Sequence, residues 1–288
     1  MIAIDLGAWL IQAHQRLMAV SDTPRLDAQR LLAHITGSSP AILLAHPERQ
    51  FTLEEFTEAE HGLALLEGGT PLAYVLGEWE FYGLKFTITP DVLIPRPETE
   101  LLVQTALDWL KEHPSATKVA DVGCGSGCIG ISLAVHASCI SVQSVDVSTE
   151  ALDVTQRNAI RHDVAHRVVT KHQDLLCGDA QTFDIICANL PYIPTSDLNH
   201  LKVARYEPLL ALDGGEDGMM FIRRLVNQLG SHLSTPGLAL FEIEYRQADT
   251  SLIIAREALP NASIKVINDL AGLPRVLVIE QKGNHHAN

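Results

Sequence analysis

The chain has 288 residues, of which 47% are hydrophobic, and this length and composition allow one large domain together with a small one. The net charge of −14 is spread along the chain: residues 1–110 carry 6 Lys and Arg against 15 Asp and Glu, and residues 111–288 carry 15 against 20. Neither part holds a basic block, which disfavours tight, salt-sensitive binding of nucleic acid. The acidity fits a basic protein partner, and it also fits a protein that only has to stay soluble.

Cysteine usage and hydropathy exclude further classes of protein. The five cysteines are odd in number and form no C-x-x-C pair. We therefore expect neither a disulfide framework nor a metal site, and we interpret all five as small core residues in a reducing cytosol. Residues 1–10 lack the features of a signal peptide, and no run approaches the roughly 20 apolar residues of a membrane span. The expectation is a monomeric cytoplasmic protein that contacts no membrane and no nucleic acid directly.

Residues 1–75 have the pattern of a small helical bundle. A helix is expected at about residues 5–20. Thr23 and Ser39 each precede a proline, so each is placed to cap a further helix that begins with that proline. Thr52 and Glu55 have the spacing of a capping box at the start of a fourth helix.

Residues 76–95 are expected to form a linker that contains a β-hairpin. The stretches Trp79–Phe81 and Leu84–Ile88 are rich in aromatic and branched residues, and they bracket a glycine. Two such runs separated by a short glycine-containing turn are typical of a hairpin.

Residues 96–288 have the pattern of an α/β domain. After a helix at about residues 97–111, short apolar strands alternate with helical stretches, which indicates a parallel sheet with helices on both faces. Two late strands are joined too closely for a crossover helix, so they should pair antiparallel. We expect a doubly wound, Rossmann-like sheet, mostly parallel with an antiparallel final strand, as is typical of S-adenosylmethionine-dependent methyltransferases. The expected strands are Val119–Val122, Val142–Asp146, Val168–His172, Asp184–Ala188 and Leu238–Ile243, then the late pair Ser263–Ile267 and Arg275–Glu280.

A glycine-rich loop follows the first of these strands and opens a helix. Glycines allow a sharp turn and a close approach of a ligand to the backbone. The spacing is G-x-G-x-G, whereas the dinucleotide fingerprint is G-x-G-x-x-G, which makes a nicotinamide-dependent oxidoreductase a poor alternative. The loop residues expected to bind a cofactor are Gly123, Cys124, Gly125, Ser126 and Gly127.

Acidic residues follow the next two strands. Asp146 ends the second strand, where a carboxylate is placed to accept hydrogen bonds from both ribose hydroxyls of an adenosine. The alternative is an acidic helix cap, because Ser148 and a helix follow. Asp174 and Leu175 come after the third strand and are expected beside the adenine, and for Asp174 a plain loop residue is the alternative.

The segment Asn189-Leu190-Pro191-Tyr192 directly follows the fourth strand, at the edge where open α/β sheets bind their ligands. Its residue types suit the methylation of an amide, whose nitrogen is a poor nucleophile because its lone pair is delocalised. The Asn189 side-chain oxygen and a backbone carbonyl in 189–191 could accept both amide hydrogens and favour an amine-like geometry. The Tyr192 ring could stack on the planar amide. The alternative is an N-x-P turn that ends a strand.

The chain resembles the HemK-type (PrmC) family of peptide chain release factor glutamine methyltransferases along nearly its whole length. Leu93–Glu100, with the letters L-I-P-R-P-E-T-E, is similar to the family's linker into the catalytic domain. Asp121–Gly127 matches its cofactor loop. Glu207–Leu212 and Gly214–Gly218 match the segment after its catalytic motif, and Asp269–Val278 is similar to its C-terminal strands.

The resemblance implies a particular reaction: transfer of a methyl group from S-adenosylmethionine to the glutamine side-chain amide in the Gly-Gly-Gln motif of class 1 release factors. The helical domain would hold the release factor. Asn189, Pro191 and Tyr192 would be catalytic, and these three together with Leu190 would bind the substrate. Asn189 would also contact the cofactor, and Thr99 would lie at its methionine end.

One departure from the family leaves alternatives open. The family usually has proline where this chain has Leu190, and the N-L-P-Y motif also resembles that of ribosomal-RNA adenine dimethylases. A glutamine methyltransferase of a ribosomal protein, an adenine methyltransferase of nucleic acid and a non-catalytic cofactor-binding module are therefore alternatives. The acidic surface and the segments around Arg96 and Glu207 favour the protein substrate.

Overall fold

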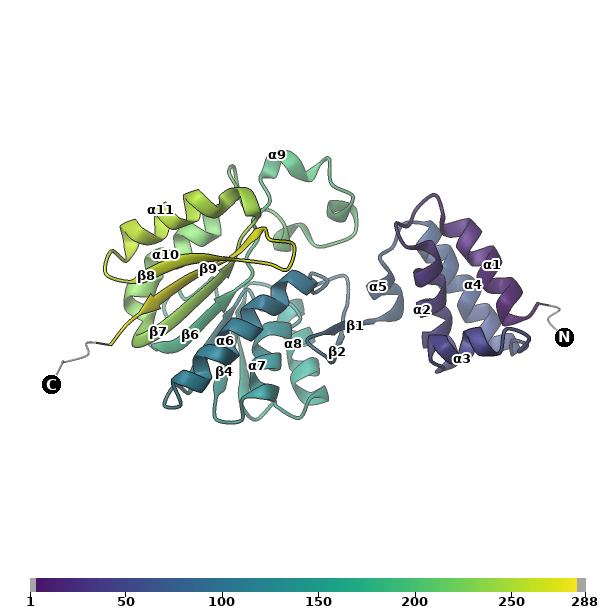
Figure 1. Cartoon of the computed structure of the whole chain (residues 1–288), viewed down its shortest axis with the longest axis horizontal. Helices are drawn as coiled ribbons and strands as arrows, with labels where there is room; N and C mark the ends of the chain where they lie inside the picture. Colours follow the sequence, from purple (N-terminus) through teal and green to yellow (C-terminus); the bar gives the residue numbers. More distant parts are fainter. Residues whose placement is uncertain (1–3, 284–288) are drawn as a thin grey trace. The chain divides into compact units, whose positions relative to one another are not determined.

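The computed structural model describes residues 4–283. These residues divide between Glu78 and Trp79 into two compact units. Each unit is described by itself, and Figure 1 shows the elements of both.

The first unit is helical, as expected. Asp5 caps α1 by accepting from the Ala8 N–H, Ser39 caps α3, and Thr52 and Glu55 form both bonds of the capping box of α4. Thr23 stands at the N-cap position of α2, but its side chain accepts no hydrogen bond from the helix backbone, so the expected cap is wrong. The Thr23 hydroxyl donates instead to the Asp27 carboxylate. The helices are α1 (Leu6–Leu17), α2 (Pro24–Thr36), α3 (Pro40–Ala45), α4 (Leu53–Glu67) and the unforeseen α5 (Leu72–Leu76).

Trp9 is among the largest fully buried side chains of this unit. Trp9 is 1% exposed, and its indole N–H donates to Glu60 at 2.7 Å. Arg16, two turns further along α1, donates to both Glu60 and Glu67 of α4. Burial of the tryptophan and a bidentate arginine pair therefore join α1 to α4.

The expected hairpin of β1 (Glu78–Phe81) and β2 (Leu84–Thr87) lies in the second unit except for Glu78, and a seven-stranded sheet follows it. Its helices are α6 (Glu100–Glu112), α7 (Cys128–His136), α8 (Thr149–Arg161), α9 (Thr195–Leu198), α10 (Met220–His232) and α11 (Ala248–Ala258), with 3₁₀ turns at Pro97–Thr99, Val203–Arg205, Leu209–Ala211 and Tyr245–Gln247. Its strands are β3 (Lys118–Val122), β4 (Ser141–Asp146), β5 (Val168–His172), β6 (Phe183–Ala188), β7 (Leu233–Glu242), β8 (Ser263–Asn268) and β9 (Pro274–Gln281).

The sheet has the strand order β5-β4-β3-β6-β7-β9-β8. Strands β3 to β7 pair in parallel, and β9 pairs antiparallel with both β7 and β8. The last strand therefore inserts between its two predecessors, and the mostly parallel sheet with an antiparallel final strand is confirmed. The chain order reverses between β3 and β6, the kind of switch point at which open α/β sheets bind ligands.

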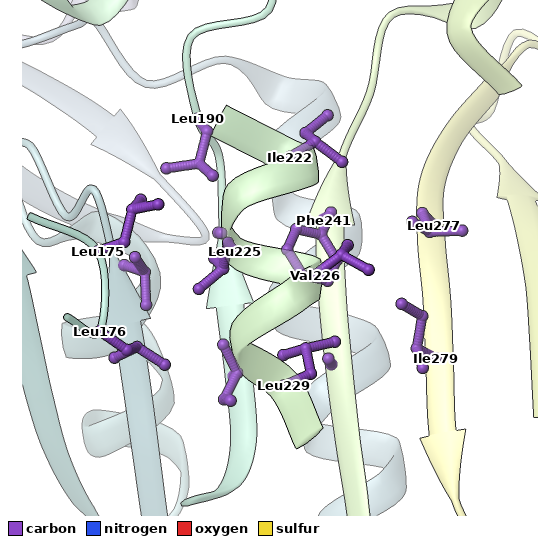
Figure 2. Packing of buried hydrophobic residues seen from close by; sticks show 14 of the residues in the cluster. Leu175, Leu176, Leu190, Ile222, Leu225, Val226, Leu229, Phe241, Leu277 and Ile279 are labelled. Carbon is purple, nitrogen blue, oxygen red and sulfur yellow. The ribbon is translucent and has the colours of Figure 1, made fainter. Parts of the chain in front are cut away.

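Helices cover both faces of this sheet, with α6, α7 and α8 on one face and α10 and α11 on the other (Figure 1). The residues Ile222, Leu225, Val226 and Leu229 of α10 recur at helical spacing and lie over Phe241 of β7 (Figure 2). The apolar residues of the central parallel strands and the amphipathic helices above them bury each other, which gives the sequence its α/β alternation.

Within residues 4–283, no helix is long and apolar enough to cross a membrane. In the same residues, no group of three His, Cys, Asp or Glu side chains is arranged to hold a metal ion. All five cysteines are free. Cys124, Cys128 and Cys187 are buried, whereas Cys139 and Cys177 are exposed, so the interpretation of all five as core residues was wrong for these two.

Candidate functional site

A cavity of about 520 Å³ opens at the carboxyl ends of β3, β4 and β6. Parallel strands present their carboxyl ends at one edge, and this brings together loops that are distant in sequence. Of the residues expected to bind cofactor or substrate, Gly127 and Tyr192 do not line this cavity. Those that line it are Thr99, Gly123, Cys124, Gly125, Ser126, Asp146, Asp174, Leu175, Asn189, Leu190 and Pro191.

The glycine loop turns sharply at the cavity wall. Gly123, Gly125 and Gly127 all have positive φ, between 54° and 76°. A Cβ on Gly125 would meet no protein atom within 4 Å, so this backbone is open to a ligand. At Gly127 a Cβ would come within 2.8 Å of Ile131 and Thr155. Gly127 therefore serves the packing of α7 against α8, while Gly125 faces the ligand space.

Asp146 lines the cavity and holds the glycine loop in shape. One carboxylate oxygen accepts from the Gly125 N–H at 2.9 Å, and the other accepts from the Ser148 N–H at 3.0 Å. Ser148, and not Asp146, caps α8, because the Ser148 hydroxyl accepts from the Ala151 N–H. Burial raises the pKa of Asp146, and the backbone N–H bonds oppose that shift. Each oxygen still has a lone pair for a ligand hydroxyl.

The wall beyond β5 is formed by Gln173, Asp174 and Leu175. Leu175 is buried with φ of 54°, which turns the chain into the cavity. Asp174 is half exposed, and its carboxylate pairs with Arg224 of α10 at 2.6 Å. The Gln173 carboxamide has no hydrogen-bond partner among the described residues, and sequence reasoning did not single it out. Both of its polar atoms are buried, so an unsatisfied carboxamide lies at this part of the cavity wall.

Asn189 and Leu190 follow β6 and differ in what their side chains contact. The Asn189 side-chain Nδ2 donates to the Thr99 hydroxyl at 3.1 Å, and its Oδ1 has no partner among the described residues. The Leu190 side chain is 4% exposed and belongs to the apolar cluster beneath α10 (Figure 2). No described residue donates to the Leu190 carbonyl. Asn189 and Leu190 both line the cavity, and neither the Asn189 Oδ1 nor the Leu190 carbonyl accepts a hydrogen bond from a described residue.

The segment after Tyr192 packs directly on the backbone of the Asn189–Tyr192 segment. A Cβ on Gly214 would come within 2.8 Å of the Pro191 carbonyl oxygen and the Tyr192 Cα, and a Cβ on Gly218 would come within 2.2 Å of the Tyr192 carbonyl oxygen. The Gln247 side chain donates to that same oxygen at 2.9 Å. Gly214 and Gly218 are thus required by close contact with the backbone of the Asn189–Tyr192 segment.

A buried hydrogen-bond chain lies behind Asn189. The Thr99 hydroxyl, which accepts from Asn189, donates to the Glu242 carboxylate at 2.6 Å, and the Tyr192 hydroxyl donates to the other Glu242 oxygen at 3.3 Å. Glu242 is the last residue of β7 and is 1% exposed. Sequence reasoning missed it, although a charged residue in the apolar run L-A-L-F-E-I was a usable signal.

Burial shifts the pKa values of the two titratable groups in this hydrogen-bond chain, Glu242 and Tyr192. It raises the pKa of Glu242, an effect that the Thr99 and Tyr192 hydrogen bonds and the positive charge of Arg275 oppose, while Glu98 adds to it. Burial also raises the pKa of Tyr192, and the Glu242 charge raises it further. Tyr192 is therefore a neutral hydrogen-bond donor at physiological pH.

A second buried carboxylate joins the two segments that flank the cavity. The Glu207 carboxylate accepts from the Arg96 guanidinium and from the Ile94 N–H, the latter at 3.0 Å. Glu207 is 6% exposed. Since Val92, Leu93 and Pro95 line one side of the cavity and Pro208, Leu210 and Ala211 line another, this pair holds two walls together.

Asp121, at the end of β3, is fully buried beneath the glycine loop. One oxygen accepts from the Gly130 N–H at 2.9 Å, and the other has no partner among the described residues. Burial raises its pKa to about 7. The folded state therefore binds more protons than the unfolded state between the ordinary aspartate pKa near 4 and about pH 7. In this window stability falls as pH rises.

We accordingly expect Asp121→Asn to flatten the pH dependence of unfolding. The wild-type free energy of unfolding should fall relative to that of the variant by up to about 1.4 kcal/mol per pH unit between pH 4 and 7, since one proton is released. Urea unfolding at several pH values in this range measures it. Parallel profiles for the two proteins would show that the buried carboxyl is not the titrating group.

The doubly wound sheet, its antiparallel last strand and the glycine-loop cavity define a methyltransferase. Residues 8–77 match the PrmC N-terminal domain, and residues 97–205 match the methyltransferase small domain. A methyltransferase structure from Pyrococcus furiosus shares the fold, with a TM-score of 0.51 and 16% identity over 79% of this chain and 98% of that one.

Relatives of similar length give the family. The release factor glutamine methyltransferase of Koribacter versatilis is 39% identical over 264 residues, which cover 90% of this chain and 92% of that protein. The one from Coxiella burnetii is 35% identical over 264 residues, covering 92% and 94%. The chain belongs to the release factor glutamine methyltransferase family.

Proposed function

We propose that this enzyme transfers a methyl group from S-adenosylmethionine to the side-chain amide nitrogen of the glutamine in the Gly-Gly-Gln motif of class 1 peptide chain release factors. The observation that carries the proposal is the Asn189 side chain at the cavity. Its nitrogen is held by Thr99, and its oxygen is left as an acceptor. A monomer in the cytoplasm fits this activity, as does the absence of a basic block that would bind RNA.

The residues present fit the proposed cofactor. Asp146 can accept hydrogen bonds from ribose hydroxyls, the open backbone at Gly125 leaves room for close approach, and Leu175 with Gln173 can face the adenine. The Thr99 hydroxyl has given its proton to Glu242, so it can offer a ligand only a lone pair. When bound, S-adenosylmethionine supplies a sulfonium methyl group that is already activated for transfer.

The protein must then align an amide nitrogen with that methyl group. Asn189 Oδ1 and the Leu190 carbonyl can each accept one hydrogen of the substrate carboxamide, which fixes its plane and favours an amine-like geometry at nitrogen. Pro191 keeps the residue before it extended, so the carbonyl is held in place. No strong general base is needed, because the proton can leave once the nitrogen is alkylated. Catalysis is mainly alignment.

Tritium transfer from labelled cofactor tests the substrate. We expect label in an intact release factor, and none in a release factor whose Gly-Gly-Gln glutamine is replaced by asparagine. A ribosomal protein and an adenine-containing ribosomal RNA fragment serve as the competing substrates in parallel reactions. Label in either of these, with none in the release factor, would overturn the assignment in favour of that substrate.

The helical unit is proposed to dock the release factor. Removing residues 1–77 leaves the β1–β2 hairpin and the sheet intact. We expect the truncated protein to bind cofactor with nearly unchanged affinity, since every residue lining the cavity lies in the second unit. It should lose methylation of the intact factor. A folded truncated enzyme that methylates release factor at the full rate would show that this unit does not dock the substrate.

A further inference from the structure

We propose that Glu242 is a positioning residue for methyl transfer: through the Thr99 hydroxyl, its carboxylate fixes the Asn189 carboxamide with Oδ1 toward the cavity. This inference rests on the proposed function, in which that oxygen accepts a hydrogen from the substrate amide. Glu242 does not line the cavity, so it acts through other residues.

The direction of the hydrogen-bond chain follows from counting protons. A carboxylate can only accept, so the Thr99 hydroxyl must give its single proton to Glu242, at 2.6 Å. Thr99 then has only lone pairs for Asn189, whose nitrogen end must face it at 3.1 Å. The oxygen end of the Asn189 carboxamide is thereby turned away from Thr99. These directions hold while Glu242 is ionised, because a protonated carboxyl could itself donate to Thr99.

The orientation matters because the two ends of a carboxamide are nearly equal in size and opposite in hydrogen bonding. With the ends exchanged, Asn189 would present N–H groups to the N–H groups of a substrate amide, and no bond would form. An asparagine at a cavity edge can adopt either orientation unless a neighbour selects one. Glu242 supplies that selection from a place that water does not reach, where hydrogen bonds are stronger.

The fold brings the three side chains together at one sheet edge. Strands β6 and β7 are parallel neighbours with Ala188 opposite Phe241, so Asn189 and Glu242 follow at the same level. Thr99 arrives from the 3₁₀ turn before α6. The Tyr192 hydroxyl donates to the second Glu242 oxygen and so holds the carboxylate from the other side. Tyr192 thus supports Asn189, the first residue of the same segment, through Glu242.

The cost of this arrangement argues that it has a use in catalysis. A carboxylate that is 1% exposed loses most of its hydration, and no salt bridge pairs with it among the described residues. Arg275, whose positive charge lowers the pKa of Glu242, pairs instead with Asp269 at 3.1 Å. An apolar residue at the end of β7 would avoid this cost. An apolar residue, however, could not accept the hydrogen bonds from the Thr99 and Tyr192 hydroxyls.

A double-mutant cycle tests whether Glu242 and Thr99 act through Asn189. We expect Thr99→Val, which removes only the hydroxyl, to lower the single-turnover rate about tenfold at saturating cofactor, the effect of one aligned hydrogen bond. Thr99→Ser, which restores the hydroxyl, should recover most of the rate. In the Asn189→Ala background, Thr99→Val should cause no further loss, because the group being positioned is gone.

Matched variants separate this role from general packing. Thr105→Val removes a hydroxyl from the helix α6 that follows Thr99, where it bonds only to the Leu101 carbonyl, and it should react like wild type. Glu242→Gln places both a donor and an acceptor at this position, so the hydrogen bonds between residues 242, 99 and 189 can run in either direction. This variant should slow the reaction, and its cofactor affinity should change less than its rate. Equal losses from Thr99→Val in both backgrounds, or a wild-type rate for Thr99→Val, would overturn the proposal.

A readout without turnover keeps this inference distinct from the proposed function. The ¹⁵N–¹H resonances of the Asn189 side-chain amide can be assigned by their absence in Asn189→Ala. We expect them to exchange slowly with water in the wild type and faster in Thr99→Val and Glu242→Gln. Slow exchange that does not change in these variants would refute the positioning role. If the wild type failed to methylate any release factor, the proposed function alone would fall, and this measurement would still decide the orientation.

Discussion

Replacing Asn189 by alanine should lower the rate of methyl transfer about a hundredfold or more, while cofactor affinity changes little. The Asn189 oxygen is the one side-chain acceptor at the end of β6 that no described residue engages, and it is held in place through Thr99. Loss of one such aligned group that stabilises a transition state costs about 3 kcal/mol. Single-turnover methylation of a release factor, with cofactor binding measured by calorimetry, checks both halves of the expectation.

Two variants serve as controls for this prediction. Asn189→Asp keeps an acceptor oxygen and should retain more activity than Asn189→Ala. Leu190→Pro restores the residue usual in the family and preserves the backbone carbonyl, so its rate should stay near wild type. Its stability should fall by about 1–3 kcal/mol, because the buried leucine side chain is lost from the core. A wild-type rate for Asn189→Ala together with an inactive but folded Leu190→Pro would reverse the two roles.

The sequence predicted the central strands because β3 and β6 are buried along nearly their whole length and appear as short apolar runs between helical stretches. The edge strand β5 is more exposed, yet its bounds, Val168–His172, agree with the prediction. The antiparallel end followed from the short link between β8 and β9. Strand β7 was the poorest case: it begins at Leu233, five residues before the expected start, because its polar first half with Ser234 and Pro236 lacks the apolar signal.

The residues that touch the cavity were more predictable than the residues that support them. Gly123, Asp146 and Asn189 each directly follow or end a strand, so chain position alone placed them at the sheet edge. Glu242 reaches Thr99 across 143 residues of sequence, and Glu207 reaches Arg96 across 111. No local pattern indicates such partners, since the contact exists only after the sheet has formed.

Replacing Asp146 by alanine should weaken the binding of S-adenosylmethionine by about 2–4 kcal/mol, or roughly thirtyfold to a thousandfold. Two proposed charge-assisted bonds to the ribose hydroxyls are lost together. The same carboxylate also accepts from the N–H groups of Gly125 and Ser148, so the glycine loop loses its support. Because burial raises the pKa of Asp146, wild-type affinity should begin to fall at a pH above the ordinary aspartate range as the solution is made acidic.

Calorimetric titration of the purified variant gives the affinity, and Asp174→Ala is the matched control. Asp174 also lines the cavity, but its half-exposed carboxylate pairs with Arg224, so its removal should change affinity by less than about 1 kcal/mol. Asp146→Asn separates the contribution of the negative charge from that of the acceptor oxygens, because it loses the charge and keeps one acceptor oxygen. Its cofactor affinity should lie between those of the wild type and Asp146→Ala. A folded Asp146→Ala protein with unchanged cofactor affinity would remove Asp146 from the binding site, leaving it as the residue that shapes the glycine loop.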